Sequence, residues 1–311
     1  MKTFSKLQKI DYLKSIYELG YEMEKWPNFF IVGAPRAGTT SMYEFLKRTP
    51  GVYMSPQKEP HYFSNFNPQY MFGNIIRDER KYLSLFKDAK NEVAIGECST
   101  SYLWDAKSCH LIKNKIPNAR IVIMLRNPVQ RAFSHYLLRV GGGQTLSFSE
   151  IIKIALKAPK EDYYTTIIVN GGFYSEQVKR YLETFSSDRV KIIFFEEFIK
   201  YPKKIVKELL KFLGVNGEPP DIIETVHNEF TIPRGKIVTS LMQTKLARKI
   251  GEQIPHSLYE PLVKNIMSKK GNKPIIPSED SLFLEDLYRS DIEKLKVILG
   301  RELPWNITKS N

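Results

Sequence analysis

A glycine-containing loop between a strand and a helix constrains this chain more than any other stretch. Residues 29–32 (Phe-Phe-Ile-Val) form a short apolar run that is typical of a buried strand. The loop 33–38 follows, and apolar residues then recur at helical spacing from Met42 to Leu46. Backbone N–H groups at the start of such a helix, together with the helix dipole, favour an anion. The stretch therefore predicts an anion site where this strand meets this helix.

The loop has the spacing of a P-loop between Gly33 and Gly38. The lysine of that motif is missing, because Thr39 stands in its place, and a cation lies inside the loop at Arg36. We therefore expect the loop to hold a phosphate, but not in the manner of an ordinary nucleotide triphosphatase. The alternative is a plain turn whose glycines only permit the bend.

The rest of the chain alternates apolar strands with amphipathic helices. This alternation predicts an α/β fold with a P-loop-like central parallel sheet flanked by helices. About thirty residues after Gly141-Gly142-Gly143 are expected to be irregular and to suit a substrate-facing loop or lid. The expected strands are 29–32, 52–54, 93–97, 120–126 and 190–195, and the expected helices are 77–87, 107–116, 128–140, 174–185, 202–213 and 281–299.

Length and charge limit the organisation and the partners. The 311 residues are enough for one large α/β domain or for two domains, and we expect a helical extension over 1–27 and a single domain over 28–311. A net charge of +13 favours anionic partners, among them nucleotides, nucleic acid, charged glycans and membrane surfaces, without choosing among them.

Sequence features that mark other compartments are absent. No run of about 18 apolar residues and no apolar signal-peptide core occurs. The two cysteines, Cys98 and Cys109, make neither a disulfide framework nor a metal motif. We therefore expect a cytoplasmic protein with no transmembrane segment and no metal.

Charged side chains follow the expected strands at the ends where ligands bind in parallel sheets. Lys58, Glu59 and His61 lie in a proline-bounded loop after the strand 52–54. A glutamate in such a loop is usually only solvated, but its position makes Glu59 a candidate site residue. Glu97 ends the strand 93–97 and is interpreted as catalytic, as orienting a loop or as a cap, with a supporting role favoured.

A second phosphate site is indicated after the strand 120–126. This strand ends in Arg126, and Ser134 lies two turns into the helix that Pro128 opens. Both side chains lie off the apolar face of that helix, so together they are placed to clamp a phosphate. The alternative is a salt-bridged arginine and a solvent-exposed serine.

Taken together, these segments resemble the sulfotransferases that use 3′-phosphoadenosine 5′-phosphosulfate. The loop 33–41 looks like that family's 5′-phosphosulfate-binding loop, and residues 126–136 look like its 3′-phosphate-binding segment. Residues 58–63 are similar to the stretch that carries the catalytic glutamate in the glycan (heparan-type) branch. Shorter matches lie at 172–174, 195–198, 212–214 and 303–305. Many glycan-type members have lysine where Arg36 stands, and often a lysine where Cys98 stands.

The resemblance implies sulfuryl transfer from this donor to an acceptor hydroxyl. Positioning and charge stabilisation do most of the work in such a reaction. Glu59 is the implied base and His61 the second choice, while Arg36 is implied to neutralise charge on the bridging oxygen. The residues expected to bind the donor are Arg36, Ala37, Gly38, Thr39, Thr40, Ser41, Arg126, Ser134, Tyr174, Arg234, Gly235 and Lys236. Those expected to contact the acceptor are Lys58, His61 and Glu97.

Two other functions compete with this interpretation. A P-loop kinase or related nucleotide enzyme requires a lysine at position 39, which Thr39 occupies. A non-catalytic polyanion-binding protein on the same fold requires only the basic charge. The acceptor itself is left open among a glycan, a lipid-linked sugar and a small alcohol, with nucleic acid not expected.

Overall fold

Five parallel strands form the central sheet, in the order β2-β3-β1-β4-β5. They are β1 (Phe29–Gly33), β2 (Val52–Met54), β3 (Ala94–Cys98), β4 (Arg120–Leu125) and β5 (Val190–Phe194). The computed structural model describes residues 25–65, 75–141, 144–157, 163–219, 231–233, 268–270 and 274–305.

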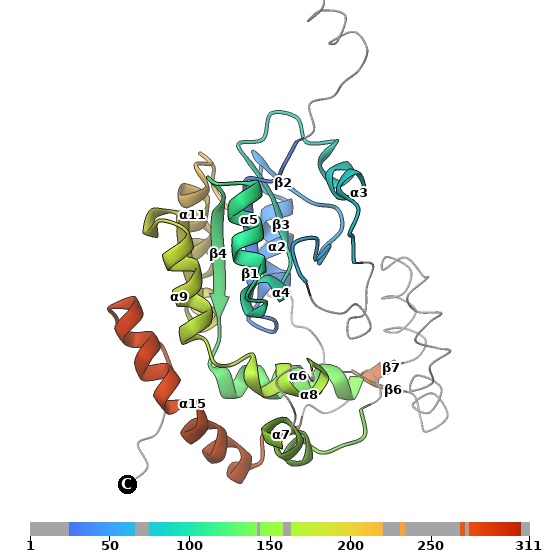
Figure 1. Ribbon diagram of the computed structural model, residues 1–311, viewed down its shortest axis with the longest axis vertical. Coiled ribbons are helices and arrows are strands. Elements are labelled where there is room, and N and C mark those ends of the chain that lie inside the picture. The colour runs from blue at the N-terminus through green and yellow to red at the C-terminus, as the bar shows by residue number, and fades with distance from the viewer. Residues whose placement is uncertain are drawn as a thin grey trace, which may run out of the picture.

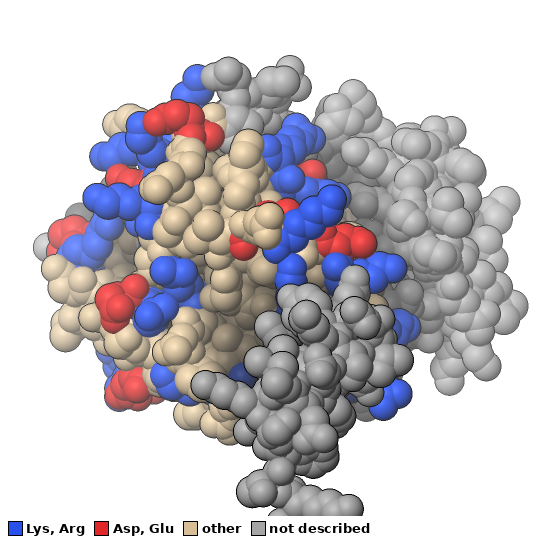
Figure 2. Space-filling model, turned by 90° about the horizontal axis from the view of Figure 1, so that it is seen from above, with Lys and Arg blue, Asp and Glu red and all other residues tan. Residues whose placement is uncertain are grey.

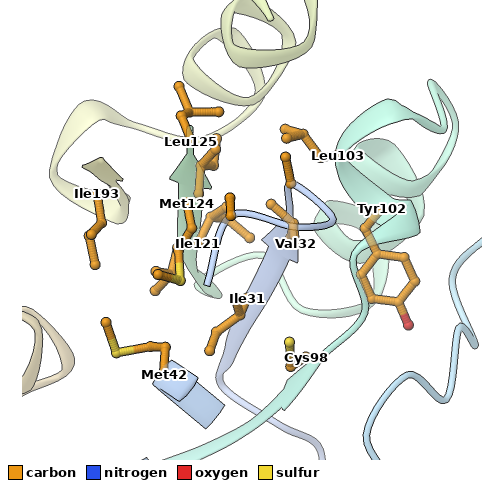
Figure 3. Packing of buried hydrophobic residues seen from close by; sticks show 14 of the residues in the cluster. Ile31, Val32, Met42, Cys98, Tyr102, Leu103, Ile121, Met124, Leu125 and Ile193 are labelled. Carbon is orange, nitrogen blue, oxygen red and sulfur yellow. The ribbon is translucent and has the colours of Figure 1, made fainter. Parts of the chain in front are cut away.

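The centre of the sheet is apolar because β1 and β4 are covered on both faces. Residues 29–32 and 121–125 are all fully buried, which explains their nearly unbroken runs of aromatic and aliphatic side chains. Figure 3 shows Met42 on one side of β1 and Leu103 on the other. The core therefore continues from the sheet into a helix layer on each face.

Helices connect the strands and cover both faces (Figure 1). Helices α5 and α9 lie in front of the sheet in that view, and α2 and α11 lie behind it. The helical elements before the last long helix are α2 (Thr39–Lys47), α3 (Glu79–Leu83), η2 (Ser84–Phe86), α4 (Ser101–Trp104), α5 (Ser108–Lys115), α6 (Pro128–Gly141), α7 (Phe148–Lys157), α8 (Tyr163–Asn170), α9 (Ser175–Thr184), η3 (Ser187–Arg189), α10 (Phe195–Lys200) and α11 (Pro202–Leu213).

A second group of helices lies beyond the carboxyl ends of the strands. Helices α6, α7 and α8 occupy this end in Figure 1, and α15 (Ser278–Leu299) packs beside them. The buried guanidinium of Arg131 donates to the carbonyl of Ile168 at 2.5 Å, and the Tyr288 hydroxyl donates to that of Val169 at 2.6 Å. These bonds fasten the end of α8 to α6 and α15. A short antiparallel pair, β6 (Thr231–Pro233) and β7 (Ser268–Lys270), completes the described elements.

The parallel sheet flanked by helices confirms the predicted fold class, but three local predictions were wrong. The stretch after residue 143 contains α7 and α8 instead of an irregular loop. The buried residues of α7 are Phe148, Ile151, Ile152 and Ala155, and this helical spacing was the missed signal. The helix predicted over 77–87 is shorter and becomes a 3-10 turn at Ser84, whose hydroxyl donates to the carbonyl of Lys81. Helix α15 begins at Ser278, not at residue 281.

The excess positive charge is not gathered into one patch on the face seen in Figure 2. That view, from the top of Figure 1, shows basic side chains spread among acidic ones. Within the described ranges, no helix combines the length and the apolarity that crossing a membrane requires. The predicted extension over 1–27 falls almost entirely on residues outside the described part.

Candidate functional site

The loop after β1 leads into the N-terminus of α2 as predicted. Gly38 precedes the helix with a φ of 86°, and a Cβ there would lie 2.8 Å from the ring of Phe195, so only glycine fits. No side chain caps this helix end and its first turn holds no acidic residue. The backbone N–H groups of Thr39, Thr40 and Ser41 are therefore left for an anion.

Two arginines that follow the neighbouring strands β1 and β4 meet in the loop before this helix. Nε of Arg36 donates to the hydroxyl of Ser134 on α6 at 3.1 Å, and Nη1 of Arg126 donates to the backbone carbonyl of Arg36 at 3.1 Å. No described carboxylate forms an ion pair with Arg36. Burial, and then the charge of Arg126, lower the pKa of Arg36 to about 10. The pair is a concentrated positive charge that a bound anion would neutralise.

Arg126 is held from three sides. The buried Tyr174 donates its hydroxyl to the Arg126 carbonyl at 2.9 Å, and the Arg126 guanidinium lies 4.6 Å from the centre of the Phe195 ring. The next residue, Asn127, donates its N–H to Glu196 at 2.9 Å, and Glu196 also accepts from Trp305 Nε1 at 2.9 Å. The segments 172–174, 195–198 and 303–305 therefore meet behind this cation.

A second cluster lies in the loop after β2, around Glu59. Its Oε1 is 2.7 Å from Lys58 Nζ, and its Oε2 is 3.2 Å from Nε2 of His61. The side chain of Glu59 remains 28% exposed. Burial acts to raise the pKa of Glu59, but the charge of Lys58 and the hydrogen bonds to the carboxylate hold the pKa below its ordinary value. Glu59 is therefore an ionised, partly accessible carboxylate.

The end of β3 and the residues after it hold this loop in place. The Glu59 N–H donates to the Cys98 carbonyl at 2.9 Å, and the Thr100 N–H donates to Glu59 Oε2 at 2.9 Å. The Ser99 hydroxyl accepts from the His61 N–H at 3.0 Å, and the Ser101 hydroxyl lies 2.7 Å from His61 Nδ1. Residues 98–101 thus fix both the backbone and the side chains of the Glu59 loop.

His61 lies behind Glu59 and not at the surface. Its side chain is only 3% exposed, and both ring nitrogens have partners, Glu59 and Ser101. Burial lowers the pKa of His61 to about 4, so the imidazole is neutral near pH 7. A neutral ring whose Nε2 carries the proton donates it to Glu59 and accepts from Ser101. This geometry makes Glu59 the more accessible base of the two.

Strained backbone is concentrated at these same residues. Arg36, Glu59 and His61, with φ of 70°, 61° and 53°, are the only non-glycine residues of the described chain with positive φ. Each such residue costs about 1–2 kcal/mol. Strain of this kind persists where the surrounding contacts enforce it, and it clusters at functional sites. It falls on the three residues that the sequence singles out for catalysis.

Glu97 lies beneath this loop, fully buried. Its carboxylate accepts from the hydroxyls of Tyr102 at 2.6 Å, Ser99 at 2.7 Å and Tyr82 at 3.2 Å. Burial raises the pKa of Glu97 to about 7. This environment agrees with the supporting role favoured from the sequence. A direct contact with the acceptor, which was also predicted, stays a prediction that this burial does not favour.

The structure brings most of the predicted residues to one edge of the sheet. Since β1 is the neighbour of both β3 and β4, the Arg36 loop lies between the Glu59 cluster and Arg126. Tyr174 is fully buried, so it supports Arg126 from behind, and its direct contact with a nucleotide stays a prediction. The predicted residues Arg234, Gly235 and Lys236 lie outside the described residues.

Sequence reasoning missed the hydroxyl run Ser99-Thr100-Ser101. A signal was present, because three consecutive hydroxyl side chains directly follow a strand that ends beside the site. It also missed Glu196 as the partner of Asn127 and Trp305. These pairings join residues 69 and 109 positions apart, and no local sequence pattern indicates them.

Comparisons with known proteins identify a family and a related solved structure. The family model described as "Sulfotransferase domain" matches residues 27–296. A solved structure, a sulfotransferase from Alicyclobacillus acidocaldarius, is similar over 90% of this chain and 98% of its own, with a TM-score of 0.64 and 29% identity.

Two curated relatives share lower identity. Carbohydrate sulfotransferase 15 of Mus musculus is 25% identical over 275 residues, which cover 68% of this chain and 48% of that protein. The bifunctional heparan sulfate N-deacetylase/N-sulfotransferase 2 of Homo sapiens is 25% identical over 313 residues, which cover 94% of this chain and 32% of that protein. The chain thus spans about half or less of the length of these relatives.

Proposed function

The chain belongs to the sulfotransferase family, since that family's model matches residues 27–296, and we propose that it transfers a sulfuryl group from 3′-phosphoadenosine 5′-phosphosulfate to an acceptor hydroxyl. The observation that carries the proposal is the pairing of Arg36 with Arg126. Two half-buried arginines meet in the loop that precedes the uncapped start of α2, and no described carboxylate pairs with Arg36. Such a site is built for a multiply charged anion.

The donor side of the site fits a nucleotide with two separate phosphate groups. The N–H groups of residues 39–41 and the Arg36 guanidinium would hold the 5′-phosphosulfate. Arg126 and Ser134 would hold the 3′-phosphate, which distinguishes this donor from ATP. The donor supplies a sulfuryl group on a phosphate leaving group, and Arg36 is placed to stabilise the charge that develops on that leaving group.

The acceptor side of the site centres on Glu59. Its carboxylate would take the proton of the acceptor hydroxyl as the acceptor oxygen attacks sulfur. Lys58 and Thr100 hold the carboxylate in place through bonds of 2.7 and 2.9 Å, and the neutral His61 supports it from behind. A positioned base of this kind contributes about 10²–10⁴-fold to the rate.

For the acceptor we propose a sugar hydroxyl. The names of two relatives, a carbohydrate sulfotransferase and a heparan sulfate N-sulfotransferase, support a glycan acceptor, although the second name refers to transfer to nitrogen. The basic charge of the chain, 47 lysines and arginines against 34 acidic residues, suits an acceptor that is itself acidic. Lys58, whose ammonium group lies beside the Glu59 carboxylate, is the cation that we propose orients such an acceptor.

Calorimetric binding of adenosine 3′,5′-bisphosphate, ADP and ATP without magnesium tests the donor assignment. We expect clear preference for the bisphosphate, because only that nucleotide has a phosphate for Arg126 and Ser134. Preference for ATP would favour the kinase alternative. Binding of none of the three, by a folded protein, would favour a polyanion-binding protein and contradict the proposal.

A further inference from the structure

The buried carboxylate of Glu97 connects to the Glu59 loop through two hydroxyl groups. Ser99 donates its hydroxyl to Glu97 at 2.7 Å and accepts the backbone N–H of His61 at 3.0 Å. Tyr102 donates its hydroxyl to Glu97 at 2.6 Å and accepts the backbone N–H of Phe63 at 3.3 Å. Each hydroxyl is thus a bridge from the carboxylate to one backbone amide of the loop.

The carboxylate determines which way these hydroxyl groups point. Above its pKa of about 7 the Glu97 carboxylate is ionised and only accepts hydrogen bonds, so Ser99 and Tyr102 both direct their protons toward it. Their oxygen lone pairs are then free to accept from the two loop amides. Without the carboxylate, either hydroxyl could rotate its proton elsewhere, and the N–H groups of His61 and Phe63 would lose a defined acceptor.

The amide that Ser99 holds belongs to a strained residue. His61 has a φ of 53°, and Glu59, two residues earlier, has a φ of 61°. Such conformations persist only where neighbouring contacts enforce them. The ring of His61 in turn lies 3.2 Å from Glu59 Oε2. A shift in the backbone of His61 would therefore move the ring that contacts the Glu59 carboxylate, and so change the position of that carboxylate.

We propose that Glu97 is a positioning residue for the reaction: through the hydroxyls of Ser99 and Tyr102 it holds the backbone of His61 and Phe63, so that the Glu59 carboxylate stays aligned for the acceptor. This inference rests on the proposed function, in which Glu59 is the base. Glu97 itself has no access to substrate, since it is fully buried.

The test compares Glu97→Gln with Tyr82→Phe as a matched control. The Tyr82 hydroxyl also donates to Glu97, at 3.2 Å, but no hydrogen bond joins it to the loop backbone among the described residues. Turnover is measured as release of adenosine 3′,5′-bisphosphate from the donor, with the best acceptor from a panel of sugars or, failing one, with water. We expect Glu97→Gln to lower turnover about 10- to 100-fold and Tyr82→Phe to change it less than about 3-fold. Bisphosphate binding should stay within about 2-fold in both variants.

A double variant separates positioning from general damage. If Glu97 acts through Glu59, Glu97→Gln should cause no further loss of turnover in a Glu59→Gln background. An equal fractional loss in both backgrounds, or full turnover of a folded Glu97→Gln protein, would overturn the inference. Should Glu97→Gln fail to fold, Ser99→Ala and Tyr102→Phe each break one bridge and are expected to behave as Glu97→Gln does.

The proposed function fails in a different way. Full turnover of Glu59→Gln would show that Glu59 is not the base, which overturns this inference as well. If the unaltered protein does not prefer the bisphosphate to ATP, the donor assignment is wrong. That measurement needs no Glu97 variant.

Discussion

Arg126 donates a hydrogen bond to the backbone carbonyl of Arg36 at 3.1 Å, although both side chains are cations. The bond fixes the strained backbone of Arg36 (φ of 70°) and leaves its guanidinium beside Ser134. Like charges held this close destabilise each other, and the lowered pKa of Arg36, due first to burial and then to Arg126, reflects it. A doubly phosphorylated nucleotide removes this repulsion, so the site is prepared for a ligand at the expense of the free protein.

Replacing Arg126 should reveal which phosphate it reads. We expect Arg126→Ala to weaken adenosine 3′,5′-bisphosphate about 10- to 100-fold, because a hydrogen bond to a charged group is worth about 1.5–3 kcal/mol. Adenosine 5′-monophosphate, which lacks the 3′-phosphate, should lose far less. Calorimetric titration of both nucleotides measures the difference.

The matched control is Arg120→Ala. Arg120 begins the strand that Arg126 follows, so it lies at the opposite end of β4 and away from the site. Its replacement should leave both affinities unchanged. Equal losses for the two nucleotides in Arg126→Ala would mean that Arg126 does not read the 3′-phosphate.

The charge of Glu59 should be essential to turnover and not to donor binding. We expect Glu59→Gln to reduce turnover by at least about 10²-fold, because the amide cannot take a proton, while bisphosphate affinity is kept. Glu79→Gln, at an exposed glutamate paired with Lys115, should reduce neither. Substantial turnover by Glu59→Gln would transfer the role of base to His61.

Glu59 also determines how the turnover rate should depend on pH. The pKa of Glu59 lies below its ordinary value, because Lys58 and the bonding at the carboxylate outweigh the effect of burial. The base is active when ionised, so protonation of Glu59 itself should lower the rate only below the ordinary range of glutamate, whereas a rate limb near pH 7 would report the positioning residue Glu97. Burial lowers the pKa of His61 to about 4, so titration of this histidine should not change the rate near pH 6.5. A rate limb near pH 6.5 that disappears in His61→Gln would contradict this assignment.

The parts of the fold that could be predicted are those with a local cause. The strand residues 29–32 and 121–125 are apolar throughout because both faces are covered, and the helix from Pro202 ends before Gly214, which adopts the left-handed conformation. The two phosphate segments could also be located, since loop glycines and a strand-end arginine leave a signature in the sequence.

The parts that could not be predicted depend on contacts between distant segments. Nothing local shows that the Glu59 loop is fastened to residues 98–101, or that Glu196 joins Asn127 to Trp305. The burial of His61 is likewise a tertiary property, and it decides that the imidazole supports Glu59 from behind. The role of each residue at this site depends on how deeply its side chain is buried, and local sequence patterns do not reveal that burial.

Gly38→Ala should damage the donor site more than its small size suggests. A Cβ at Gly38 would lie 2.8 Å from the Phe195 ring, which also lies under the Arg126 guanidinium, and φ is 86°. We expect a loss of about 1–3 kcal/mol in the free energy of unfolding and at least about a 10-fold loss in bisphosphate affinity. Gly300→Ala has a similar φ, 61°, with nothing within 4 Å. It should lose stability alone, and equal loss of affinity in both variants would refute the local explanation.

Glu97 predicts a dependence of stability on pH that is opposite in sign to that of an ordinary paired carboxylate. Burial raises its pKa from 4.5 to about 7, so the folded protein binds a proton that the unfolded chain releases between these values. Its contribution to stability is complete below pH 4.5 and is lost as pH rises through about 7, a change of about 3 kcal/mol. Glu97→Gln cannot titrate, so its free energy of unfolding should gain on that of the unaltered protein over this interval. Denaturant unfolding of both proteins at pH 5, 6, 7 and 8 measures the difference, and parallel curves would show that Glu97 is already ionised at pH 5, held so by its three hydroxyl donors.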